Sequence, residues 1–133
     1  LAEKDFVRAL ELNPEAAYVL NYLGYSWLER GVRINEAFDL LSLAVEIEPN
    51  DAYILDSLGW AYFHLGDYKN SIDVLEHALR IMPSDPTLNN HLGDVYWKSG
   101  RFEEAVSQWK KVLIFDPNFE NKNKVLKKIK FGI

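Results

Sequence analysis

The sequence predicts an all-α protein, a solenoid built from tandem pairs of helices. Three sets of residues predict this repeated architecture, because each set recurs at nearly the same interval along the chain. The Leu-Gly pairs begin at Leu23, Leu58 and Leu92, the second glycines are Gly31, Gly66 and Gly100, and the prolines are Pro14, Pro49, Pro83 and Pro117. Independent markers that agree on a step of 34 or 35 residues indicate a stack of similar supersecondary units.

The composition limits the class of protein. The 133 residues are 48% hydrophobic, enough for the core of one ordinary domain, and they include no cysteine, which excludes disulfides, thiolate metal ligands and cysteine nucleophiles. The net charge of −5 disfavours nucleic acid as a partner. Residues 1–117 hold 19 acidic and 10 basic side chains, a balance of −9, which favours neutral or cationic partners. No apolar run approaches the roughly 20 residues of a membrane span.

The first unit predicted is incomplete. Residues 1–14 have the apolar pattern of a second helix alone, with Pro14 at its end. A chain that begins in the middle of a repeat is expected to be a fragment of a longer array. The half repeat, which lacks its partner helix, could also mediate dimerisation. Residues 15–49 then form the first full unit, with one extra residue in the turn "GVRIN".

The next two units, residues 50–83 and 84–117, have the clearest helix boundaries. A first helix is predicted over 53–65, with Asp51 as its N-cap and Gly66 as the left-handed residue that ends it. A second amphipathic segment follows and ends at Pro83. In the third unit, Asp85 has the place of an N-cap and Pro86 that of a first helical residue.

Residues 118–133 carry five lysines against one acidic residue, Glu120, with a weak apolar stripe between them. The stripe predicts a polar capping helix, which solenoids need at their ends. Contact of the lysines with an anionic membrane is the alternative. We favour the cap, because the rest of the chain is acidic.

The repeated positions resemble those of the tetratricopeptide repeat family. After each Leu-Gly pair, the positions of that pattern hold Trp27, Tyr62 and Tyr96; Ala37, Ser71 and Ala105; Leu41, Leu75 and Trp109; and Ala44, Ala78 and Val112. Glycine opposite alanine or serine lets two helices approach closely, and the larger side chains fill the remaining space. The resemblance implies a right-handed superhelix of three full repeats, with a concave groove lined by the first helix of each repeat.

By the family pattern, the groove would be the site of protein or peptide binding. The residues expected to bind are Tyr18, Asn21, Tyr25, Tyr53, Asp56, Trp60, Phe63, His64, Asn90, Asp94 and Trp97. Further groove positions are Tyr22, Leu28, Glu29, Ser57, Thr87, His91 and Lys98. Exposed aromatic side chains are enriched at binding hot spots, although some of these could instead pack between repeats.

The character of the groove predicts the character of its ligand. Some members of the family hold a carboxylate with lysine, arginine and asparagine, but the matching positions here are Asn21, Tyr25, Trp60, Thr87 and His91. Because lysine and arginine are missing from these positions, a peptide with an acidic C-terminal tail is not the expected ligand. An aromatic and acidic groove suits a segment with apolar anchors and basic flanks.

The sequence predicts no enzyme and no cofactor. His91 and Asp94 are three residues apart on one helix and could share a metal, but two ligands are a weak signal and groove polarity is the favoured interpretation. His77 is expected in a solvated position, and every glycine of the array belongs to the repeat pattern. Two other functions remain open: a regulatory or targeting module of a larger enzyme, and RNA binding, which the acidic charge disfavours.

A finer resemblance concerns the compartment. "LNYLGYSWLER", "DAYILDSLGWAYFHLG" and "NNHLGDVYWKSGRFEEAVSQW" are similar to the C-terminal repeats of proteobacterial envelope proteins of this family, some of them lipoproteins. The resemblance implies a bacterial protein of the periplasm with an envelope protein as partner. A cytoplasmic location is the alternative.

Overall fold

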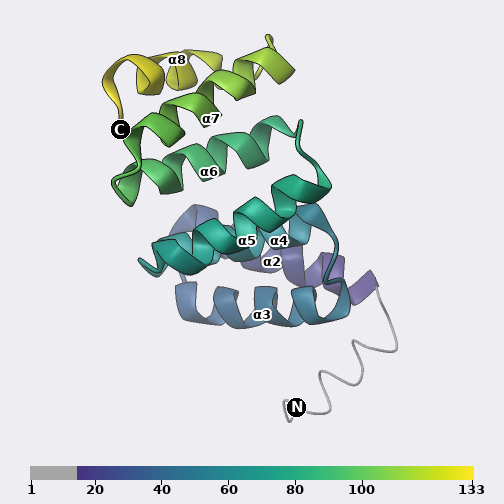
Figure 1. Ribbon diagram of the computed structural model, residues 1–133. Coiled ribbons are helices and arrows are strands. Elements are labelled where there is room, and N and C mark those ends of the chain that lie inside the picture. The colour runs from purple at the N-terminus through teal and green to yellow at the C-terminus, as the bar shows by residue number, and fades with distance from the viewer. Residues whose placement is uncertain (1–14) are drawn as a thin grey trace.

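A computed structural model describes residues 15–133, so the helix predicted over residues 1–14 lies outside the described part. The helices are α2 (Glu15–Arg30), α3 (Ile34–Ile47), α4 (Ala52–His64), α5 (Tyr68–Ile81), α6 (Pro86–Lys98), α7 (Phe102–Phe115) and α8 (Lys122–Phe131). They stack as consecutive antiparallel hairpins, with α3 at one end of the stack and α8 at the other (Figure 1). Residues 15–133 contain no strand, and the predicted all-α solenoid is confirmed.

The predicted helix boundaries in the second and third pairs are confirmed, and side chains explain them. The Asp51 carboxylate accepts hydrogen bonds from the backbone N–H groups of Tyr53 and Ile54, and Asp85 accepts one from Leu88. Both aspartates thus satisfy donors that the first turn of a helix leaves free. Gly66 follows α4 with φ +79°, the left-handed conformation that glycine adopts at little cost.

The extra residue of the first pair lies in the turn between α2 and α3. Gly31 has φ +67°, as expected, but Arg33 at the start of α3 is also left-handed, with φ 49°. The second and third pairs need a single left-handed residue in this turn. One more residue in the same connection therefore requires a second left-handed position, here filled by a residue other than glycine.

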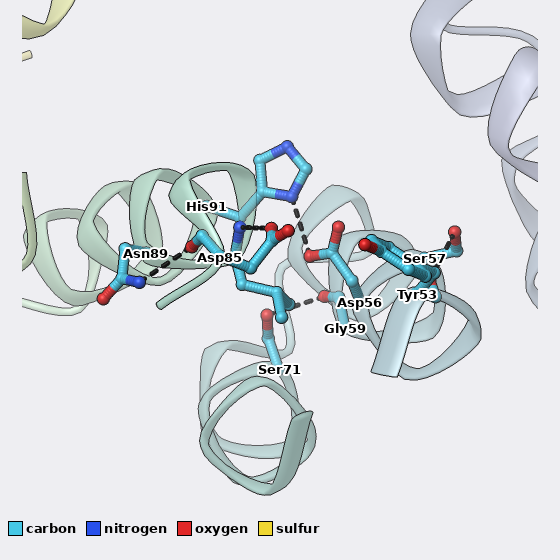
Figure 2. Close-up of polar contacts among 9 residues, drawn as sticks. Tyr53, Asp56, Ser57, Gly59, Ser71, Asp85, Asn89 and His91 are labelled. Atoms are coloured by element: carbon cyan, nitrogen blue, oxygen red, sulfur yellow. Dashed lines mark hydrogen bonds and ion pairs between the residues drawn. The ribbon is translucent and has the colours of Figure 1, made fainter. Parts of the chain in front are cut away.

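Close approach within each pair depends on the glycine of the Leu-Gly motif. A Cβ atom built on Gly59 would lie 2.6 Å from Leu75 Cγ, and one on Gly93 would lie 2.5 Å from the Trp109 ring. In the second pair Ser71 replaces the alanine of the pattern, and its hydroxyl donates a hydrogen bond of 2.6 Å to the Gly59 carbonyl (Figure 2). The serine is fully buried, so this bond satisfies its hydroxyl.

The core runs through the stack between consecutive helices. Its largest fully buried side chains include Leu41, Leu75 and Trp109, one in each pair at the same position of the repeat. Helix α8 covers the last pair by burying Val125 completely and packing against α7. A solenoid of this kind is held together by contacts between neighbours, each unit covering the next.

Candidate functional site

A cleft of about 670 Å³ opens on the side of the stack formed by the first helices of the pairs. It is lined by Tyr18, Asn21, Tyr22, Tyr25, Ser26, Glu29, Tyr53, Asp56, Ser57 and Thr87. Helix α2 contributes six of these residues, α4 three and α6 one. Except for Ser26, all are positions that the repeat pattern assigns to the groove.

Helical spacing places these side chains on one face. On α2, Tyr18, Tyr22, Tyr25 and Glu29 follow each other at intervals of three and four residues, so they form a single row. Helix α4 packs beside α2 and supplies Tyr53. Tyr22 is 78% exposed, and Tyr18 and Tyr53 are 52% and 55% exposed, so three tyrosines of the cleft present most of their surface to solvent.

Neighbouring acidic residues act on the tyrosines at both ends of the row. The Tyr18 hydroxyl donates to Asp51 Oδ2 at 3.0 Å, which raises the pKa of Tyr18. Burial and then hydrogen bonding to Glu29 raise the pKa of Tyr25. Both phenols are therefore neutral at physiological pH, and these two residues line the cleft without charge.

A buried acid–imidazole pair links α4 and α6 at the inner side of the cleft. His91 Nδ1 lies 2.7 Å from Asp56 Oδ1, and the two side chains are only 10% and 9% exposed (Figure 2). Burial alone would lower the pKa of His91, but the charge and the hydrogen bond of Asp56 outweigh it, so the pKa is raised. The pair is an ion pair whenever the imidazole is protonated.

An aromatic cluster surrounds this pair and extends along α4. The Trp60 ring stacks on His91 with centroids 4.1 Å apart and on Phe63 at 4.7 Å. His64 meets Trp60 edge-on at 5.7 Å, and burial lowers the pKa of His64. Trp60 and Phe63 are half-buried and His64 is exposed. Trp60, Phe63 and His64 of α4 therefore form one aromatic cluster with His91 of α6.

Three predicted groove residues of α6, Asn90, Asp94 and Trp97, lie instead against the C-terminal segment. The Lys128 ammonium on α8 donates to Asn90 Oδ1 and to Asp94 Oδ1, both at 2.7 Å. Asp94 also accepts a hydrogen bond of 3.0 Å from Trp109 Nε1. A Cβ on Gly132 would collide with the Trp97 ring, so the chain end lies directly on that indole. The structure thus does not bring Asn90, Asp94 and Trp97 into the cleft.

Two expectations about single residues were wrong. Leu28 is 1% exposed and belongs to the core, because it packs in a cluster with Leu41 of α3 and Leu58 of α4. His91 is a buried partner of Asp56, where polarity at the groove surface was expected. No sequence signal marks this pair, since its two members are 35 residues apart on different helices. His77 is half-buried, with Nδ1 3.3 Å from Arg80.

Two further kinds of feature, a metal-ligand cluster and a membrane-spanning helix, are absent from residues 15–133. No group of three or more His, Cys, Asp or Glu side chains is arranged there to hold a metal ion. Asp94, which the sequence places three residues from His91, accepts hydrogen bonds from Lys128 and Trp109 instead. None of the helices that the structure describes has the length and apolar character needed to cross a membrane.

Comparison with protein families matches three repeat models along the chain: a tetratricopeptide repeat over residues 1–52, a TPR repeat over 59–100 and a tetratricopeptide repeat over 86–119. The chain belongs to the tetratricopeptide repeat family. Such repeats are generally non-catalytic modules of protein interaction. A comparison with curated proteins gives no match.

Solved structures of tetratricopeptide repeat proteins superpose on most of the chain. The first such domain of human RPAP3 gives a TM-score of 0.79 at 22% identity, covering 90% of this chain and 94% of that one. Pseudomonas aeruginosa PilF gives 0.78 at 23% identity, covering 86% of this chain and 51% of that one. MamA gives 0.71 at 22% identity, covering 92% and 80%. Identities this low show a shared fold.

Proposed function

We propose that this tetratricopeptide repeat chain is a non-catalytic scaffold that binds a protein segment in the cleft between α2, α4 and α6. The observation that carries the proposal is that three tyrosines of the cleft, Tyr18, Tyr22 and Tyr53, are largely exposed although their helices are well packed. Exposed aromatic side chains gathered in a concave site are typical of peptide-binding surfaces. The binding residues would be those of the cleft together with Trp60, Phe63 and His64.

The interactions of fold neighbours support this proposal. A solved neighbour with a TM-score of 0.76 is the first TPR domain of RPAP3 bound to an HSP90 peptide. Another, with 0.77, is the type III secretion translocator chaperone SycD of Yersinia enterocolitica. Both are proteins with protein or peptide partners. We further propose that the array divides into repeats at 15–49, 50–83 and 84–117, each containing one helix pair.

The ligand proposed here is a segment with apolar anchors and basic residues. Glu29 and Asp56 are the ionisable acidic groups of the cleft, and the described residues that line it include no lysine, arginine or histidine. An acidic peptide would meet charges of its own sign, whereas a basic one would be attracted.

Peptide arrays and site-specific photo-crosslinking test this function. Apolar-basic peptides should bind the chain, and they should be captured by a photoreactive residue at position 53 within the cleft. Position 102 is a matched control, because Phe102 is 52% exposed but lies on α7, away from the cleft. Equal binding of acidic peptides, or equal capture from both positions, would count against the proposal.

A further inference from the structure

We propose that the tyrosine cleft is a receptor for one cationic side chain, lysine or arginine, of the bound segment. This inference rests on the proposed peptide-binding function and specifies its central contact. Tyr18, Tyr22, Tyr25 and Tyr53 line the site, and Glu29 contributes a carboxylate. Aromatic faces attract cations through the ring quadrupole, and a nearby carboxylate adds direct charge attraction.

An unpartnered acceptor inside the cleft points to the same ligand. Asn21 Oδ1 is buried and has no hydrogen-bond partner among the residues that the structure describes. A buried acceptor without a donor is unfavourable, so a ligand that brings an N–H group gains by reaching it. Lysine and arginine side chains are donors only, and they therefore fit an acceptor among carboxylates and π-faces.

The third helix pair contains an internal example of this recognition. Asn21 and Asn90 have the same place in their repeats, because two repeat lengths, of 35 and 34 residues, separate them. Asn90 Oδ1 accepts a hydrogen bond of 2.7 Å from the Lys128 ammonium, which also lies 5.3 Å from the centroid of the Trp109 ring. At that position of the array, then, asparagine, a carboxylate and an aromatic ring already hold a cation.

The two acidic groups of the cleft are not equivalent. Asp56 Oδ1 accepts the hydrogen bond from His91, and the imidazole compensates the charge of that carboxylate when it is protonated. Glu29 is exposed and has no ion-pair partner among the described residues. Glu29 therefore supplies the net negative charge that a cationic side chain would meet.

Titration with small probes, followed by two-dimensional amide NMR of the 133-residue chain, tests the inference. The probes are acetyl-arginine amide and acetyl-lysine methylamide, with their neutral counterparts acetyl-citrulline amide and diacetyl-lysine methylamide. We expect saturable shifts from Asn21, Tyr22, Tyr25 and Tyr53 with the two cations only. The Glu29→Gln variant should bind the cations about threefold more weakly, the size of one exposed ion pair.

Control variants keep the test interpretable. Glu36→Gln makes the same charge change at an exposed residue of α3 and should leave the affinity unchanged. Asn21→Leu removes the acceptor and should weaken binding of both cations, and Tyr22→Ala removes a ring that is 78% exposed, so the fold should tolerate its loss.

The outcomes separate this inference from the function on which it rests. Neutral probes that bind as well as the cations, or cations that shift only residues outside the cleft, would overturn the inference. If apolar-basic peptides were still captured at position 53, the peptide-binding function would survive and only the cationic contact would be wrong. If no peptide and no probe reached the cleft, both would fail.

Discussion

At the scale of single residues, the contact between Asp56 and His91 joins two helix pairs through one short hydrogen bond of 2.7 Å. The imidazole is also stacked on Trp60, so its ring plane is held by a neighbour on α4. Asp94 and Glu29 add smaller attractions that favour the protonated form. A charged group held in this way stabilises the fold only in the pH range where it carries its charge.

We expect the stability contributed by this pair to fall as the pH rises. Because the pKa of His91 is raised above 6.5, the contribution is complete below pH 6.5 and is lost as the pH passes the raised pKa. Asp56→Asn should cost about 3 kcal/mol below that pH, since it leaves a buried imidazolium without its partner. Urea unfolding of both proteins at acidic and alkaline pH measures the difference. A cost that did not shrink toward alkaline pH would contradict this account.

Gly93→Ala should destabilise the protein, although alanine is the better helix former. The new methyl group would lie 2.5 Å from Trp109 Cδ1 and Nε1. That ring is fully buried and donates a hydrogen bond to Asp94, so it can move little. Overpacking of this kind costs about 1–3 kcal/mol.

The comparison for Gly93→Ala is Gly24→Ala, whose methyl group would meet the more adaptable Leu41 at 2.8 Å. Thermal or urea unfolding of the two variants should rank Gly93→Ala as the less stable. The reverse order would show that the tryptophan can relax.

At the scale of elements, α8 is joined to α6 by charge, through the ion pair of Lys128 with Asp94. The Lys128 ammonium is 18% exposed and bridges Asn90 and Asp94. Its predicted role as a cap agrees with the burial of Val125, but the lysines are not equivalent members of a solvated face. One of them is an internal contact, and its neighbour Lys127 is exposed.

Lys128→Ala should loosen α8 while leaving the rest of the stack folded. Loss of a partly buried, charged hydrogen-bonding group costs about 1–2 kcal/mol. Amide hydrogen exchange of α8 should therefore become faster by roughly tenfold, the equivalent of 1.4 kcal/mol. Lys127→Ala, one residue away, is the matched control and should change exchange little. Equal effects of the two variants would show that the bridge contributes nothing.

The elements themselves were predictable from sequence because their signals are local. Asp51, Asp85 and Gly66 act on the backbone within three residues, and the glycine–leucine packing repeats at a fixed interval. The residues that line the cleft, Ser26 excepted, are positions that the family pattern assigns to the groove, but other assigned positions, such as Asn90 and Trp97, do not line it. Contacts between helix pairs did not, because Asp56–His91 and Asn90–Lys128 depend on which side chains meet across the stack.

At the scale of the whole molecule, the stack is held by neighbours, so disturbances should spread only as far as the next pair. Asp56→Asn acts at the contact between α4 and α6, near the middle of the described chain. It should accelerate amide exchange in helices on both sides of this contact. Lys128→Ala should act only on α8 and on the last pair, α6 and α7, because its partners Asn90 and Asp94 lie on α6. Exchange that rose uniformly along the chain in either variant would indicate a single cooperative unit instead.

The stacking of Trp60 on His91 has a consequence for spectroscopy. A protonated imidazole quenches the fluorescence of an indole that it touches, whereas a neutral one quenches it far less. With ring centroids 4.1 Å apart, Trp60 should emit weakly while His91 is charged and brighten as the proton leaves. The chain therefore carries its own optical signal beside the cleft, one that needs no attached dye and that a ligand entering between α2 and α4 would also alter.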